Sequence, residues 1–186
     1  MTRKMKRLIL IMVVMLVFTG CGNAGATKQG NKETTDNTAN GAEDNSGTTT
    51  EGYSFEYNEV SIPMNVEAAP IVEALGESVD YFEAASCAFQ GLDKIYSYNG
   101  FELGTYPNGD KDYVSYVTLL DDSVSTDKGV YVGSALEEVT TAYGNEYTVE
   151  GSSYVYRRGD SKLSFIVEED TVAQITYSAI VEGLNN

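Results

Sequence analysis

The sequence predicts an α+β domain over residues 53–186, built from two tandem units that each contain a helix and an antiparallel meander. Three observations predict it. Several segments alternate apolar and polar residues, which is typical of half-buried strands. Two other segments place apolar residues on one side of a short helix and end at glycine. This order occurs twice, so we expect one curved sheet with both helices packed on one face.

The first unit extends over about residues 60–128. It is preceded by an alternating pattern over 53–62, which predicts a strand that ends at Pro63. Apolar residues share one side of a helix that we expect over 67–75, with Gly76 as its stop. Strands are then expected over 81–89, 94–106 (interrupted by Asn99-Gly100) and 113–120, with a turn at 107–110.

The second unit extends over about residues 129–181. Its helix is expected over 135–143, because Ser134 and Glu137 match a capping box and Gly144 provides the stop. Three strands of a second meander are then expected over 154–157, 162–167 and 172–177.

A shift of 68 positions aligns the two units. It pairs Gly76 with Gly144 at the predicted helix stops, and Gly91 with Gly159 at predicted hairpin turns. Glycine adopts positive φ values that other residues avoid, so these matches fall where a repeated backbone needs them.

The N-terminal residues resemble an export signal that ends in a lipidation site. Four basic residues within 3–7 precede an apolar run over 8–18, which is too short to span a bilayer but is typical of a secretion signal. Residues 18–21, Phe-Thr-Gly-Cys, resemble the lipobox of bacterial lipoproteins. The resemblance implies that residues 1–20 are a signal peptide and that acyl chains on Cys21 hold the protein in the lipid bilayer. The alternative is an ordinary signal peptide followed by an incidental cysteine.

The segment 21–52 separates this site from the domain. After Cys21 it contains no aromatic or large aliphatic residue and is rich in Thr, Asn, Gly and acidic residues. Such a chain cannot bury enough apolar surface to offset its conformational entropy, so we expect a disordered tether.

The domain itself carries a second resemblance. The stretch over 129–144, a glycine-flanked capped helix that ends in Ala-Tyr-Gly, is similar to a signature of secreted Gram-positive lipoproteins with the β-lactamase-inhibitory-protein-like fold. The resemblance covers about residues 60–180 and implies a tandem repeat whose concave sheet face binds proteins. This chain lacks the Trp residues and disulfides that the inhibitor uses, so the resemblance does not imply β-lactamase inhibition.

Composition excludes several classes of function. The chain has 12 Lys+Arg against 28 Asp+Glu, a net charge of −16, and no His. Without His, Ser-His-Asp nucleophile activation and imidazole metal ligands are excluded, and no cofactor is predicted. A strong negative charge disfavours binding to nucleic acid. The domain over 53–186 alone has 6 Lys+Arg against 23 Asp+Glu, a net charge of −17, so we expect a neutral or cationic partner.

Tyrosines provide the candidate binding residues. Alternate residues of a strand share a face, so tyrosines two positions apart lie together. If the apolar residues of strand 162–167 face the helices, the opposite sheet face needs side chains that tolerate water, and tyrosine does so while offering binding area. Core packing is the alternative. The predicted anchors for an extracellular protein, peptide or glycan are Tyr96, Tyr98, Tyr154 and Tyr156.

Acidic residues and one cysteine provide the remaining candidates. A weak calcium site is predicted among Asp110, Asp112, Asp121 and Asp122, with hydrated turn acids as the alternative, and no other metal site is expected. The acids at 168–170 suggest a carboxylate-based hydrolase only weakly, because adjacent acids at a hairpin tip point apart into water. Cys87 is expected to be a buried small side chain.

Together these patterns predict an exported lipoprotein, anchored at Cys21 to the outer face of the membrane of a Gram-positive cell. We expect it to act as a non-catalytic binding module through a Tyr-rich acidic sheet face. The first alternative is a structural or envelope-assembly lipoprotein, and the second is the carboxylate-based hydrolase.

Overall fold

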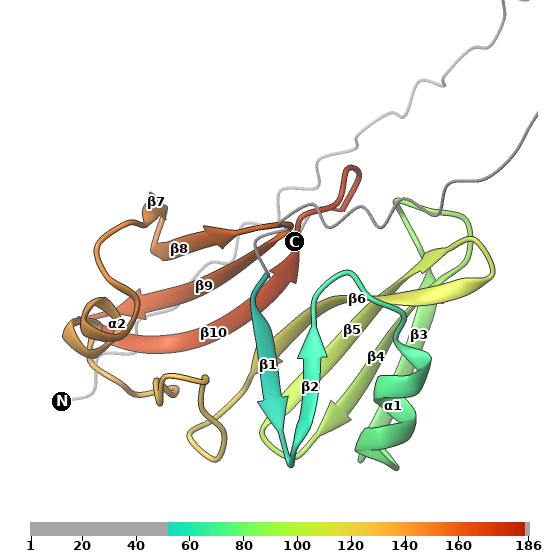
Figure 1. Ribbon diagram of the computed structural model, residues 1–186, viewed down its shortest axis with the longest axis horizontal. Helices are drawn as coiled ribbons and strands as arrows, with labels where there is room; N and C mark the ends of the chain where they lie inside the picture. The colour runs from blue at the N-terminus through green and yellow to red at the C-terminus, as the bar shows by residue number, and fades with distance from the viewer. Residues whose placement is uncertain (1–51, 185–186) are drawn as a thin grey trace, which may run out of the picture. The chain divides into compact units, whose positions relative to one another are not determined.

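A computed structural model describes residues 52–184, in which strands predominate over helices (Figure 1). The predicted signal peptide, Cys21 and all of the predicted tether except its last residue lie outside the described residues. The helices are α1 (Ala69–Leu75) and α2 (Leu136–Tyr143). The strands are β1 (Ser54–Tyr57), β2 (Val60–Pro63), β3 (Asp80–Ala85), β4 (Leu92–Tyr98), β5 (Phe101–Asn108), β6 (Lys111–Leu119), β7 (Thr148–Glu150), β8 (Ser153–Arg158), β9 (Ser161–Glu168) and β10 (Thr171–Ala179).

Eight strands form one antiparallel sheet in the order β3-β4-β5-β6-β10-β9-β8-β7. The strands on either side of α2 therefore meet where β6 pairs with β10. Leu119 lies opposite Ile175 in this pair, and Val117 lies opposite Tyr177, so the hydrophobic core continues across the junction. The remaining two strands, β1 and β2, form a separate hairpin.

The predicted antiparallel sheet accompanied by two helices is confirmed at this coarse level, but the strands differ in number. The segment predicted as one strand over 94–106 is two strands, β4 and β5, joined at Asn99-Gly100. β7 was not predicted. The segment over 53–62 is a hairpin, because Asn58 and Glu59 adopt φ values of 48° and 67° and reverse the chain between β1 and β2.

Both helices end where the sequence predicts. Gly76 and Gly144 follow α1 and α2 with φ values of 79° and 84°, a conformation that a side chain would strain. The start of α2 differs by one position from the predicted capping box. Glu138 accepts a hydrogen bond of 2.8 Å from the backbone N–H of Ala135, whereas the prediction named Glu137 and Ser134.

One hydrophobic cluster contains side chains from both helices, the hairpin and the large sheet. Phe55 of β1 is completely buried at its centre. Its ring centroid lies 5.1 Å from that of Phe101 in β5 and 5.8 Å from that of Tyr177 in β10. The hairpin therefore packs against both halves of the large sheet. None of the helices within residues 52–184 is long and apolar enough to span a membrane.

Candidate functional site

The structure places the four predicted tyrosine anchors against the core. Tyr98 and Tyr156 are buried, and Tyr96 and Tyr154 are half-buried against the hydrophobic cluster. Tyr156 lies directly opposite Leu163, and directly opposed residues point to the same face of a sheet. The prediction of an exposed Tyr-rich face is therefore wrong: these tyrosines share the face of the apolar strand residues.

We expect the core tyrosines to resist ionisation. Burial raises the pKa of Tyr156 to about 12 and raises the pKa of Tyr143 and Tyr177 further above the usual value of 10.0. The pKa of such a buried phenol is higher in the folded chain than in the unfolded chain, so its protonated form stabilises the fold. This contribution is complete below about pH 10 and is lost as the pH rises through the pKa of the folded chain. An alkaline absorbance titration should therefore show some of the 14 tyrosines ionising near pH 10 and the rest only on unfolding. Ionisation of all of them near pH 10 in the folded chain would contradict this burial.

The opposite face of the large sheet is polar. The strand registers align one residue from each strand into a row across the whole sheet, and seven of the eight are polar. This polar row consists of Asp80, Ser97, Glu102, Thr118, Thr176, Ser164, Val155 and Thr148. The Oγ1 atoms of Thr118 and Thr176 lie 3.3 Å apart where the two halves of the sheet join.

A groove of about 630 Å³ lies over the middle of the polar row. Short hydroxyl side chains form much of its floor, one aromatic ring lies in it, and charged side chains of both signs line it. Its lining residues, which define the polar groove, are Glu102, Tyr116, Thr118, Leu120, Glu150, Ser153, Val155, Lys162, Ser164, Ile166, Gln174, Thr176 and Ser178. A floor of this kind provides many hydrogen-bonding groups to an extended polar ligand.

The ring of Tyr116, which lines the polar groove, packs against a glycine on the neighbouring strand. Gly104 lies directly opposite it, and a Cβ atom at position 104 would lie 2.1 Å from Cε1 of the tyrosine ring. The ring therefore occupies the space above Gly104. Burial raises the pKa of Tyr116, and the carboxylates of Glu102 and Asp93 raise it further, so the hydroxyl stays protonated at neutral pH.

A second hollow, of about 360 Å³, shares Tyr116 with the polar groove. Two of its lining residues carry buried oxygen atoms, Asp93 Oδ1 and Thr105 Oγ1, that have no hydrogen-bond partner within residues 52–184. Thr105 is only 3% exposed. A buried polar atom without a partner costs about 1–3 kcal/mol, which a ligand that hydrogen-bonds to it can recover. The two atoms therefore favour a ligand that brings hydrogen-bond donors.

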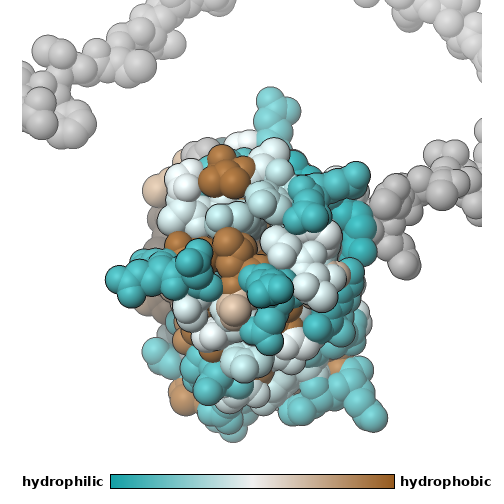
Figure 2. Space-filling view, turned by 90° about the vertical axis from the view of Figure 1, so that its left-hand side faces the viewer, coloured by the Kyte–Doolittle hydropathy of each residue, from teal (hydrophilic) through white to brown (hydrophobic). Residues whose placement is uncertain are grey.

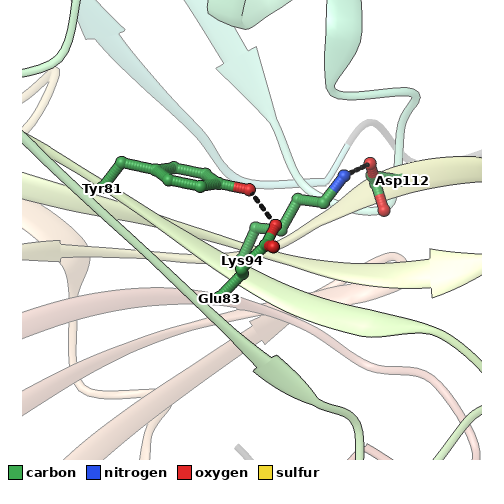
Figure 3. Close-up of polar contacts among 4 residues, drawn as sticks. All are labelled: Tyr81, Glu83, Lys94 and Asp112. Atoms are coloured by element: carbon green, nitrogen blue, oxygen red, sulfur yellow. Dashed lines mark hydrogen bonds and ion pairs between the residues drawn. The ribbon is translucent and has the colours of Figure 1, made fainter.

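A charged cluster lies on the other face, near the sheet edge (Figure 3). Tyr81 of β3 donates a hydrogen bond to Glu83 on the same strand, and Lys94 of β4 forms an ion pair of 2.7 Å with Asp112 of β6. The hydrogen bond to Asp112 is the main cause that raises the pKa of Lys94. Because the amine of Lys94 is already paired with Asp112, this ion pair links β4 to β6, and a partly exposed pair of this kind contributes up to about 1 kcal/mol.

The aspartates of the predicted calcium site are not brought together. Asp110 and Asp112 lie at the start of β6, whereas Asp121 and Asp122 follow its end. A strand of nine residues separates the two pairs by about 30 Å. In the described part of the chain, no group of three or more acidic, Cys or His side chains is arranged to hold a metal ion. The calcium prediction is therefore wrong in its geometry.

The remaining candidate residues lie in exposed turns. Glu169 and Asp170, with φ values of 49° and 61°, form the turn between β9 and β10, and both side chains and that of Glu168 are exposed. Cys87 is exposed in the loop after β3, which ends at Ala85, so the prediction of a buried cysteine is wrong. Cys21 lies outside the described residues.

Comparisons with known proteins leave the family of the chain open. No protein-family model matches the chain, and no curated protein matches it. It is similar to a solved structure of a DUF4309 family protein, YjgB, from Bacillus subtilis subsp. subtilis str. 168, at 18% sequence identity and a TM-score of 0.37. The similarity covers 61% of this chain and 78% of that chain. A likeness of this size indicates neither a family nor a function.

Proposed function

We propose that the protein is an exported lipoprotein, anchored to the outer face of the cell membrane through acylated Cys21, whose domain binds an extracellular protein, peptide or glycan without catalysis. The N-terminal sequence supports the anchor, and the lack of His supports a non-catalytic role. The side of the domain drawn in Figure 2 is mostly hydrophilic, with hydrophobic side chains in small separate patches, which suits a solvated position outside the membrane.

The polar groove is the proposed binding surface, in place of the Tyr-rich face. The observation that carries this proposal is the pair of buried, unpartnered oxygens of Asp93 and Thr105, which line the second hollow that shares Tyr116 with the polar groove. Asp93 Oδ1 accepts a hydrogen bond, Thr105 Oγ1 can accept or donate one, and the domain has a net charge of −17. The ligand is therefore neutral or cationic and rich in N–H or O–H donors, as are basic peptides and amino-bearing glycans.

We further propose that the two helix-and-meander units are tandem repeats with both helices on the core side of the sheet. Val139 of α2 and Ile71 of α1 belong to the same hydrophobic cluster, which supports this arrangement. With both helices on that side, the polar row is not covered by a helix, and all of its residues except Val155 are partly or fully exposed.

The binding proposal predicts opposite effects of one substitution on stability and on affinity. Thr105→Val removes the unpartnered hydroxyl at almost constant volume, so the ligand-free chain should become more stable by about 1 kcal/mol. The same variant should bind its ligand at least tenfold more weakly, as should Tyr116→Ala. Tyr131→Ala removes an exposed tyrosine outside the groove and should change neither property.

The measurements use the full chain carrying Cys21→Ser. A thermal melt measures stability. Binding is measured on arrays of lysine-rich, neutral and glutamate-rich peptides and of neutral and amino-bearing oligosaccharides. We expect retention of neutral or cationic probes and loss of that retention in Thr105→Val and Tyr116→Ala. Preferential retention of glutamate-rich peptides, or equal retention by all variants, would exclude the polar groove as the site.

A structural or envelope-assembly lipoprotein is the second candidate function. The long exposed edge strand β3 favours it, since edge strands pair readily with other chains. A stable complex with other envelope proteins that survives purification would support this second function, whereas reversible capture of a soluble ligand supports the first.

A further inference from the structure

The strand β3 is an edge that is open along its full length. Within residues 52–184 it pairs only with β4, and all six of its residues are exposed. Phe82 is 59% exposed, and Val79, which precedes the strand, is 73% exposed. The outer edge of such a strand presents unpaired backbone N–H and C=O groups. The opposite edge of the sheet, β7, has only three residues.

β3 carries two carboxylates, Asp80 and Glu83, but lacks three other common protections of an edge strand. Natural edges are commonly interrupted by a bulge, by proline or by lysine. The register of β3 with β4 is unbroken from Asp80 to Ala85, and the strand contains neither Pro nor Lys. β3 is therefore a regular template for one further strand.

We propose that the further strand is β3 of a second copy of this chain, paired antiparallel across a two-fold axis. An axis normal to the sheet leaves each residue on its own face. Directly opposed residues in an antiparallel pair point to the same face of the sheet. The axis must therefore pass midway between one residue of β3 and the same residue of the second copy. The symmetry thus places one residue of β3 at the centre, and the registers centred on Phe82 or Glu83 pair the most residues of the strand, five from each copy.

Of the two registers that pair five residues, the one centred on Phe82 is self-complementary. It places Phe82 against the partner's Phe82, which covers two exposed rings and allows an aromatic pair. It also places Tyr81 opposite the partner's Glu83, and Tyr81 already donates a hydrogen bond to Glu83 within its own chain. Asp80 is opposed by the small side chain of the partner's Ala84.

The two neighbouring registers oppose unfavourable pairs. An axis through Glu83 places two carboxylates directly opposite each other, which is destabilising. An axis through Tyr81 places Asp80 against the partner's Phe82, and Val79 against the partner's Glu83. Because the axis is normal to the sheet, the dimer centred on Phe82 keeps both polar grooves on the same side of one continuous sheet.

Salt distinguishes this dimer from binding to a cationic partner. Each domain has a net charge of −17, so two copies repel each other at low ionic strength. Screening shortens the reach of this repulsion from about 10 Å at 0.1 M salt to about 3 Å at 1 M salt. Self-association through β3 should therefore strengthen as salt is added, whereas attachment of a basic peptide weakens.

Sedimentation equilibrium of the full chain carrying Cys21→Ser and Cys87→Ser tests the surface. We expect a dimer at about 0.1 mM protein, tighter at 1 M than at 0.1 M NaCl. Phe82→Lys should weaken the dimer at least tenfold. Val149→Lys makes the same change of charge at the other edge, where Val149 is 58% exposed, and should leave the dimer at least as tight. A monomeric chain under both salt conditions, or equal weakening by both variants, would overturn the proposal.

Disulfide trapping in the same background tests the register. The Cα atoms of directly opposed residues lie about 4.5–5.5 Å apart, which a disulfide spans. Phe82→Cys should form a covalent dimer under mild oxidation at least tenfold faster than Ala84→Cys, whose copies lie four residues out of register. Equal rates, or a faster reaction of Ala84→Cys, would show that the register centred on Phe82 is wrong.

Discussion

Phe55→Ala should lower the free energy of unfolding by about 3–5 kcal/mol, a large part of the total stability of an ordinary domain. Phe55 is completely buried and lies against Phe101 and Tyr177, which belong to different halves of the large sheet. Its removal leaves a cavity that those rings cannot refill, because each is fixed by its own strand. The substitution therefore loosens the β1–β2 hairpin and the junction of the two halves together.

Denaturant-induced unfolding of wild type, Phe55→Ala and Glu56→Ala measures this effect. Glu56 is the next residue on the same strand, and its exposed carboxylate accepts a hydrogen bond from the Ser61 hydroxyl, so its loss should cost less than about 1 kcal/mol. We expect one cooperative transition with a lower midpoint for Phe55→Ala. A loss below about 1 kcal/mol, or an early partial transition that leaves the rest of the sheet unaffected, would show that the hairpin is not part of the shared core.

Local backbone preferences explain which parts of the fold could be predicted from the sequence. Gly76 and Gly144 end the helices because each needs a positive φ, which glycine adopts without strain. The turn at Asn99-Gly100 follows from the same preference, although the flanking residues form two strands and not one. The hairpin between β1 and β2 was missed because Asn58 and Glu59 adopt positive φ without any glycine to indicate it.

The face to which each strand residue points depends on register, which is not a local property. A shift by one residue moves every side chain of a strand to the other face. Tyr156 is opposed by Leu163, and this pairing places it in the core, whereas alternation alone places it with equal ease on the opposite face. The tyrosine anchors were therefore misassigned as a set, although their pairing along each strand was correct.

The polar groove could be predicted only in part. Its row of hydroxyls joins residues from strands far apart in the sequence, such as Thr118 and Thr176, and only the sheet order brings them together. One local signal was present: Gly104 lies inside a strand, and an isolated glycine there indicates the close approach of another group. That group is the ring of Tyr116.

Cys21→Ala should move the protein almost completely from the membrane fraction to the soluble fraction. Acyl chains contribute about 0.8 kcal/mol for each buried methylene, and two or more chains anchor a protein stably. The acidic domain offers no substitute, because its net charge of −17 opposes contact with anionic lipid. Cys87→Ala is the matched control: Cys87 is exposed in a loop of the domain, and its loss should leave the protein in the membrane fraction.

Cell fractionation and labelling with a fatty-acid analogue measure both variants. Retention of Cys21→Ala in the membrane fraction with unchanged labelling, or release of Cys87→Ala, would contradict the anchor. The released Cys21→Ala protein should bind the same probes as wild type, because every residue that lines the polar groove or the second hollow lies within 87–184. The two proposals therefore fail separately: loss of anchoring tests the N-terminal sequence, and loss of binding in Tyr116→Ala at an unchanged location tests the sheet face.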